Sequence, residues 1–378
     1  MPARSSTPRL AALTLALVAA AALACAPAAE VTVIAARDLG PLEQSAAIRG
    51  RDGGYSVAAW GRTIWTYGDT VLAFAGEDGS SWRNNTMSHT GDLDARDGLR
   101  GFAETVDSLG APLEFLPRTA DEAAYNAAHD QANPACADPC GAREMLWPGA
   151  MVDDPERARV LVFYGKFHGE PGEWNFSQIG ASIAVWDALY ATPRRPELVP
   201  GSAEPTLLFP VDEGWPSFGS AALAVDGELF AYGCEGSLKK HCHLGKVALG
   251  DALDRDRWRF FDGDGWSASI ADARPVLDAH TMLSVHFNSH VGRYLAIYSG
   301  PLEDTLYLRT APAPEGPWSE ELVAAETLAG VGDAANYSGM AHPELAREGG
   351  RYELLSYYRT TGEWQGEIRL IELELGPP

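Results

Sequence analysis

The chain is short of positive charge, and this shortage excludes one class of partner. Its 378 residues include 29 Lys and Arg against 52 Asp and Glu, for a formal net charge of −23. Nucleic-acid phosphates require a basic surface, so a nucleic-acid partner is excluded. The same negative charge disfavours an anionic polymer as the main ligand.

The sequence also lacks the short motifs of several protein classes. It contains no phosphate-binding glycine loop, no nucleophile-elbow serine and no zinc-protease helix. No stretch after residue 24 stays apolar for long enough to span a bilayer. These classes can therefore be set aside, and we expect neither a cofactor nor a bound metal.

The first residues have the pattern of a leader. Arg4 and Arg9 precede an apolar run from Leu10 to Ala24, which predicts a signal peptide over residues 1–25. The run ends in Ala22-Leu23-Ala24-Cys25. This sequence fits either an Ala-x-Ala cleavage site or a bacterial lipobox whose Cys25 is acylated, and we slightly favour the lipoprotein. The mature protein is then exported, either lipid-anchored in the cell envelope or free in the periplasm or outside the cell. A lipid at Cys25 would be its sole membrane contact.

Cysteine is scarce, and four of the five lie in two closely spaced pairs, Cys136 with Cys140 and Cys234 with Cys242. An even count in an exported chain predicts a disulfide within each pair. The alternative is a zinc site in which His241 and His243 join the second pair, because thiolate and imidazole groups at close spacing suit zinc.

Aromatic residues are plentiful, and five tyrosines recur in one local pattern, as Tyr67, Tyr164, Tyr232, Tyr298 and Tyr357. Each ends an apolar strand that follows another short apolar segment across a turn, as in an antiparallel hairpin. The repetition predicts an all-β fold, a five-bladed β-propeller formed as a single domain by residues 30–378. We expect EIRLIELEL to pair with VTVIAARDL and close the ring.

One helix is expected in the long insertion between the first two blades. It covers Ala120–Gln131, where Thr119 and Glu122 form a capping box. No linker divides the chain, and we expect a monomer.

The first hairpin carries a carboxylate on each strand. Its turn falls at Trp60-Gly61, and Asp52 and Asp69 are equally far from it in sequence. In an unbroken ladder their β-carbons would be roughly 4.5–5.5 Å apart, and the repulsion would raise one pKa. Two carboxyl groups with separated pKa values are what glycosidic bond cleavage requires, and this spacing is closer to the retaining geometry. The alternative is that Asp52 belongs to an Asp-Gly turn and Asp69 caps a loop.

Other polar and aromatic residues are expected around the same opening, where they would stack a sugar ring and bind its hydroxyls. The candidates are Asn85, Trp147, Lys166, His168, Trp215, Glu235, His280, Tyr337 and Arg359. Each could instead be structural, and a Trp-Pro pair at a strand start more often packs between blades.

The segment RDGGYSVAAWGRTIWTYGDT resembles a family of exported bacterial five-bladed propellers, formerly of unknown function, that includes endo-D-arabinanases. The similarity extends through LWPGAMV, SVHFNSHVGRYLAIYS, GPWSE and YELLSYYR. By this resemblance Asp52 and Asp69 match the two aspartates held to be catalytic, and D-arabinan is the implied polysaccharide substrate, cut internally. The alternative is a propeller that binds a glycan or acts as a scaffold without turnover.

Overall fold

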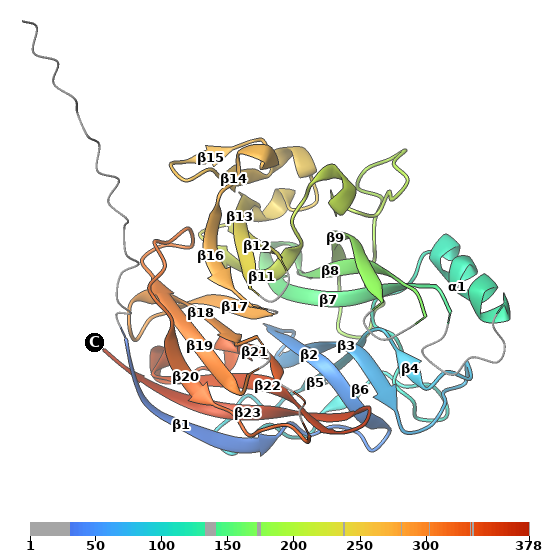
Figure 1. The fold of residues 1–378 in the computed structure, drawn as a ribbon, viewed down its shortest axis with the longest axis horizontal. Coiled ribbons are helices and arrows are strands. Elements are labelled where there is room, and N and C mark those ends of the chain that lie inside the picture. The colour runs from blue at the N-terminus through green and yellow to red at the C-terminus, as the bar shows by residue number, and fades with distance from the viewer. Residues whose placement is uncertain are drawn as a thin grey trace, which may run out of the picture.

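The computed structural model describes residues 31–377 except 133–140, 172–174, 237–238, 281, 302, 333 and 335. The predicted signal peptide, Cys25, Cys136 and Cys140 lie outside the described residues. Five antiparallel sheets are arranged around a central axis (Figure 1), which confirms the predicted five-bladed β-propeller. In the described part of the chain, no helix has the length and apolar character needed to cross a membrane.

Each sheet is one blade, and most of its strands follow one another in order. The exceptions are β4, which pairs with β3 beside β5, and β16, which pairs with β13 beside β14. Blade 1 contains β2 (Ile48–Ala59), β3 (Arg62–Leu72), β4 (Trp82–Arg83), β5 (Thr86–Thr90) and β6 (Ala103–Glu104). Blade 2 contains β7 (Arg143–Asp154), β8 (Arg159–Gly169), β9 (Phe176–Trp186) and β10 (Phe209–Pro210). Blade 3 contains β11 (Phe218–Val225), β12 (Glu228–Glu235), β13 (Lys240–Ala248), β14 (Arg259–Phe261), β15 (Trp266–Ser267) and β16 (Pro275–Ala279).

Blade 4 contains β17 (Leu283–Asn288), β18 (Arg293–Ser299), β19 (Thr305–Ala311) and β20 (Leu322–Glu326). Blade 5 contains β21 (Tyr337–Ala341), β22 (Tyr352–Gly362), β23 (Gln365–Gly376) and β1 (Thr32–Pro41). Short 3₁₀ turns connect several strands, namely η1 (Pro155–Arg157), η2 (Val211–Glu213), η3 (Leu249–Asp251), η4 (Arg255–Arg257), η5 (Ile270–Asp272), η6 (Pro343–Leu345) and η7 (Glu348–Gly350).

The ring closes where the two ends of the chain meet. Strand β1 pairs antiparallel with β23, so the first strand completes the last blade, as the sequence predicted. The innermost strands β2, β7, β11, β17 and β21 each contact the next one around the ring. They line a central hollow of about 270 Å³. The five blades therefore share one axis.

The five repeated tyrosines occupy the second strand of their blades, and all are buried. A buried hydroxyl needs a hydrogen-bond partner, and each of these has one. Tyr67 bonds to Ser88 Oγ at 2.8 Å, Tyr164 to the Thr206 carbonyl at 3.0 Å, and Tyr232 to the Pro314 carbonyl at 2.5 Å. Tyr298 donates to Glu321 at 2.9 Å, and Tyr357 accepts from the Leu328 amide at 3.1 Å. The repeated residue thus ties its strand to chain that lies further from the axis.

Helix α1 (Ala120–Ala132) lies at the outer edge of the ring, between blades 1 and 2 (Figure 1). Its predicted capping box is present, since the Thr119 amide donates to Glu122 Oε2 at 2.8 Å and the Glu122 amide donates to Thr119 Oγ1 at 3.2 Å.

Cys234 and Cys242 lie opposite each other on β12 and β13 and form a disulfide. The zinc alternative is wrong, because both sulfurs are bonded to each other. The adjacent imidazoles have carboxylate partners instead, His241 with Asp278 and His243 with Glu235.

Candidate active site

The first hairpin has the predicted turn, but its ladder is interrupted near the two aspartates. The pairs from Ala59↔Arg62 to Tyr55↔Thr66 follow the expected register. Beyond them Gly54 has no partner on β3, whereas Asp52 faces two residues of β3, Gly68 and Asp69. The extra residue on one strand compensates for the extra residue on the other. The two aspartates therefore remain neighbours although they are not a directly opposed pair.

Glycines make this interruption possible. Gly53 and Gly54 have φ values of 86° and 126°, which L side chains rarely adopt. A β-carbon on Gly68 would lie 2.5 Å from Asp52 Oδ1. The carboxyl of Asp52 thus lies over the backbone of the residue next to Asp69.

Asp69 accepts three N–H donors from two segments that lie far apart in the sequence, residues 82–84 and strand β7. Trp82 Nε1 and Asn84 Nδ2 each lie 3.1 Å from its Oδ1, and Trp147 Nε1 lies 3.2 Å from the same oxygen. Among the described residues none donates to Oδ2 in this way. All three of these side-chain donors therefore meet the same oxygen of Asp69.

Asp52 has a different environment, in which backbone amides of Asp52 and Asp69 and a side chain of blade 5 face its carboxyl. Tyr337 donates a long hydrogen bond of 3.4 Å to Asp52 Oδ2, and the Tyr337 ring packs on Tyr358 with centroids 4.7 Å apart. Burial raises the pKa of Tyr337 well above its usual value, and the nearby Asp52 charge adds to the effect. The phenol therefore stays protonated and remains a donor.

The two carboxyl groups differ in how strongly the protein favours their charged forms. Burial first, and the repulsion of Asp69 second, raise the pKa of Asp52 to about 8. Burial also raises the pKa of Asp69, but the N–H donors from Asn84, Trp82 and Trp147 oppose this rise. Hydrogen bonds to a carboxylate stabilise its ionised form. Of the pair, Asp52 is the one that holds a proton at neutral pH.

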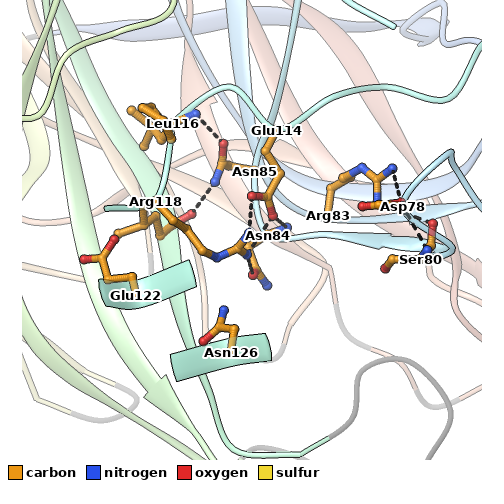
Figure 2. A network of polar contacts seen from close by, with 12 residues as sticks. Asp78, Ser80, Arg83, Asn84, Asn85, Glu114, Leu116, Arg118, Glu122 and Asn126 are labelled. Atoms are coloured by element: carbon orange, nitrogen blue, oxygen red, sulfur yellow. Dashed lines mark hydrogen bonds and ion pairs between the residues drawn. The ribbon is translucent and has the colours of Figure 1, made fainter. Parts of the chain in front are cut away.

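Asn84 owes its orientation to a second layer of polar residues. Arg118 Nη2 donates to its Oδ1 at 2.6 Å, which turns the amide nitrogen toward Asp69. Glu114 accepts from Arg118 and from the Asn84 backbone amide (Figure 2). The amide is therefore fixed as a donor to Asp69.

Asn85, the neighbouring candidate, is engaged with backbone groups. It donates to the Leu146 carbonyl at 3.0 Å and accepts the amides of Phe115 and Leu116 at 2.8 and 2.6 Å. Sequence reasoning chose Asn85 and missed Asn84. The two residues lie between β4 and β5, and only their long-range partners distinguish them.

Of the other predicted residues, Trp147 donates a hydrogen bond to Asp69 and Tyr337 donates one to Asp52. Lys166 is buried between three carboxylates, those of Glu122, Glu144 and Glu204, at 2.7–3.2 Å. This cluster joins α1 to blade 2, and the Lys166 ammonium is paired with these carboxylates rather than with either aspartate.

The remaining candidates contact groups in or near their own blades. His168 lies 2.9 Å from Glu170, and Trp215 packs on Phe209 and Phe260. Glu235 bonds to His243, and His280 lies 3.7 Å from Glu321. Arg359 donates to the Ala329 carbonyl and to Glu367.

Among the described residues, neither of two hollows is lined by Asp52 or Asp69. The larger, about 450 Å³, lies among residues 39–44, 97–100 and 367. The central hollow begins at Tyr55 and Ser56, shortly after Asp52 in the chain. Asp52 and Asp69 are themselves half-buried, so a ligand can reach them.

Comparisons with known proteins agree with this fold. A family model described as "Domain of unknown function (DUF4185)" matches residues 41–364. A Bacteroides ovatus protein provisionally named a hydrolase is 14% identical, with 87% of each chain covered and a TM-score of 0.57. Zg3597, a family 117 glycoside hydrolase from Zobellia galactanivorans, is 11% identical, with 92% of each chain covered and a TM-score of 0.51. The comparison with curated proteins finds no match.

Proposed function

Because the chain belongs to the DUF4185 family, whose description names no activity, we propose a function from its site: hydrolysis of glycosidic bonds in a neutral furanose polysaccharide. One observation carries the proposal, the juxtaposition of two carboxyl groups with opposite hydrogen-bond environments. Asp69 has three side-chain N–H donors on one oxygen, whereas the one side-chain donor described for Asp52 is Tyr337, at 3.4 Å, beside the backbone amides of Asp52 and Asp69. The same fold carries the family 117 glycoside hydrolase, so the architecture is suited to this chemistry.

The asymmetry assigns a role to each aspartate. Asp52, protonated at neutral pH, donates its proton to the glycosidic oxygen as the bond breaks. Asp69, ionised and oriented by Trp82, Asn84 and Trp147, uses its Oδ2 either to attack the anomeric carbon or to activate a water molecule. Tyr337 positions the Asp52 carboxyl.

The substrate class follows from charge and from family resemblance. A net charge of −23 repels acidic polymers, so a neutral polysaccharide is the natural ligand. The resemblance of the first hairpin to endo-D-arabinanases makes D-arabinan the first polymer to test. We further propose that the protein is exported through residues 1–25.

The test is a reducing-end assay of the mature protein against arabinans, galactans and fructans. We expect new reducing ends from a furanose polymer, and none from the double variant Asp52→Asn, Asp69→Asn. The control is Asp153→Asn, because Asp153 is a half-buried carboxyl of the central hollow whose pKa burial also raises. Turnover by the folded double variant, or tight binding by the wild type without any turnover, would refute hydrolysis by this pair.

A further inference from the structure

Aromatic side chains continue on both sides of the aspartate pair. Trp82, which donates to Asp69, packs edge-on against Trp364 with centroids 5.6 Å apart. Trp147, which donates to the same oxygen, packs against Phe176 at 5.0 Å. We call these four residues the aromatic row.

The row crosses three blades. Trp364 belongs to the turn between β22 and β23 of blade 5, Trp82 lies on β4 of blade 1, and Trp147 and Phe176 lie on β7 and β9 of blade 2. Asp69 is at its middle because both central tryptophans donate to its Oδ1.

The two end members are exposed although they are large and apolar. Trp364 is 52% exposed and Phe176 is 41% exposed. Trp82 and Trp147 are partly buried. An exposed aromatic at each end of a row that passes through a catalytic pair is suited to stacking on sugar rings on either side of the bond that is cut.

The turn that carries Trp364 is held against blade 1. A β-carbon added to Gly50 of β2 would lie 2.7 Å from the Gly366 nitrogen of β23, so the two backbones meet there. A β-carbon on Gly366 would in turn overlap the ring of Tyr358. Trp364 is therefore placed by close packing of β23 on β2, close to the strand segment that carries Asp52.

We propose that the aromatic row is the binding track of an extended neutral polysaccharide, with Trp364 and Phe176 as its outer subsites on opposite sides of the scissile bond. This inference rests on the proposed function and deepens it. A track that continues past the aspartates in both directions accommodates the interior of a polymer, so cleavage within the chain follows from it.

The experiment compares Trp364→Ala and Phe176→Ala with matched controls. Trp60→Ala is the control for Trp364, since Trp60 is also an exposed tryptophan in a hairpin turn, with φ of 51° against 54°, and also packs edge-on against a second tryptophan. Phe287→Ala is the control for Phe176, since Phe287 is 52% exposed and has a single described aromatic partner, Tyr294. Each control lies at a hairpin turn or strand end of β2 or β17 away from the aspartates.

Two readouts separate this inference from the proposed function. The first is kcat/KM on D-arabinan and on the shortest D-arabinofuranose oligosaccharide that the wild type cleaves. The second is calorimetric binding of long oligosaccharides to the Asp52→Asn, Asp69→Asn variant, with and without each row substitution, which needs no catalysis.

We expect each row substitution to lower kcat/KM on the polymer and the affinity for long oligosaccharides about tenfold, a size typical of a buried aromatic contact. Cleavage of the shortest substrate, and both readouts for the two controls, should not change. Row variants indistinguishable from their controls, in proteins that keep their thermal midpoint, would overturn the track while leaving hydrolysis intact. If the wild type binds but does not cleave, a loss of affinity confined to the row variants still supports the track.

Discussion

At the scale of single residues, the site places one side-chain type in two different environments. Asp52 and Asp69 are chemically identical, and both are half-buried. Burial raises the pKa of both groups, but three N–H donors oppose the rise at Asp69, whereas the charge of Asp69 adds to the rise at Asp52. Their surroundings alone separate acid from carboxylate.

The pH dependence of turnover should report this separation. Activity requires Asp52 to be protonated, so kcat/KM should fall as pH rises through about 8. It also requires Asp69 to be ionised, so activity should fall again at acid pH, with a midpoint above that of an ordinary aspartate because burial raises the pKa of Asp69. A pH–rate profile with full activity well above pH 9 would contradict the assignment of Asp52 as the acid.

Stability should also respond to pH at Asp52. Its pKa rises from 3.8 in the unfolded chain to about 8 in the fold, so below pH 4 both states hold the proton and nothing is lost. Between these values the unfolded state loses its proton first, and the folded state becomes progressively less stable as pH rises. Asp52→Asn should therefore stabilise the protein at pH 8, by on the order of 1 kcal/mol given solvent screening of a half-exposed group, and not at pH 4. Urea unfolding at both pH values measures this difference, and an equal effect at both would contradict it.

At the scale of elements, the β-hairpin is the unit in which the residue pattern determines strand placement and register. The repeated tyrosine places the second strand of every blade, and the turn at Trp60-Gly61 sets the register of the first hairpin. The register of the hairpin formed by β12 and β13 likewise places Cys234 directly opposite Cys242, where the two form a disulfide.

Replacing both of these cysteines by serine should lower stability. The bond closes a loop across a sequence separation of 8 residues, and the chain-entropy model assigns such a loop about 2–3 kcal/mol. The free energy of unfolding in denaturant measures the change, and the m-value should stay the same. Since the site is formed by blades 1, 2 and 5, turnover by the folded variant should match the wild type; a loss of activity would show that blade 3 contributes to the site.

Many of the secondary-structure elements could be predicted from the sequence, because hairpins and capping boxes depend on residues that are near neighbours in the chain. The tyrosine-bearing hairpins, the turn of the first hairpin and the helix cap at Thr119 are of this kind. The closing pair of β1 with β23 joins distant segments, and its prediction rested on the ring that the repeats imply. The compensating irregularities at Gly54 and Gly68 could not be predicted, since backbone dihedral angles are not visible in a residue pattern. The donors Trp82 and Asn84, and the confinement of Trp215 and Glu235 to other contacts, depend on tertiary packing between distant segments.

At the scale of the whole molecule, ring closure holds the site together. Blade 5 contributes Tyr337 and Trp364 to a site whose aspartates belong to blade 1, and the strand that completes blade 5 is the first in the chain. Blades 3 and 4 complete the ring, while the side chains that hydrogen-bond to Asp52 and Asp69 in the described part of the chain come from blades 1, 2 and 5.

Removal of β1 should therefore weaken the ring that holds the site together. A chain that begins at residue 42 loses the β1–β23 pairing and exposes the edge of β23, an unpaired strand of a kind that promotes association. We expect a lower thermal midpoint and concentration-dependent oligomers, measured by calorimetry and by size-exclusion chromatography with light scattering. A monomer of unchanged midpoint would contradict the role of β1 in closing the ring.

The most direct test of the central claim is the turnover of D-arabinan oligosaccharides by Asp69→Asn alone. The substitution keeps the shape of the side chain but removes the carboxylate that attacks the anomeric carbon or activates water. We therefore expect kcat to fall by about a thousandfold or more. The circular dichroism spectrum and the thermal midpoint should be preserved. A folded Asp69→Asn protein that retains turnover within tenfold of the wild type would contradict the account.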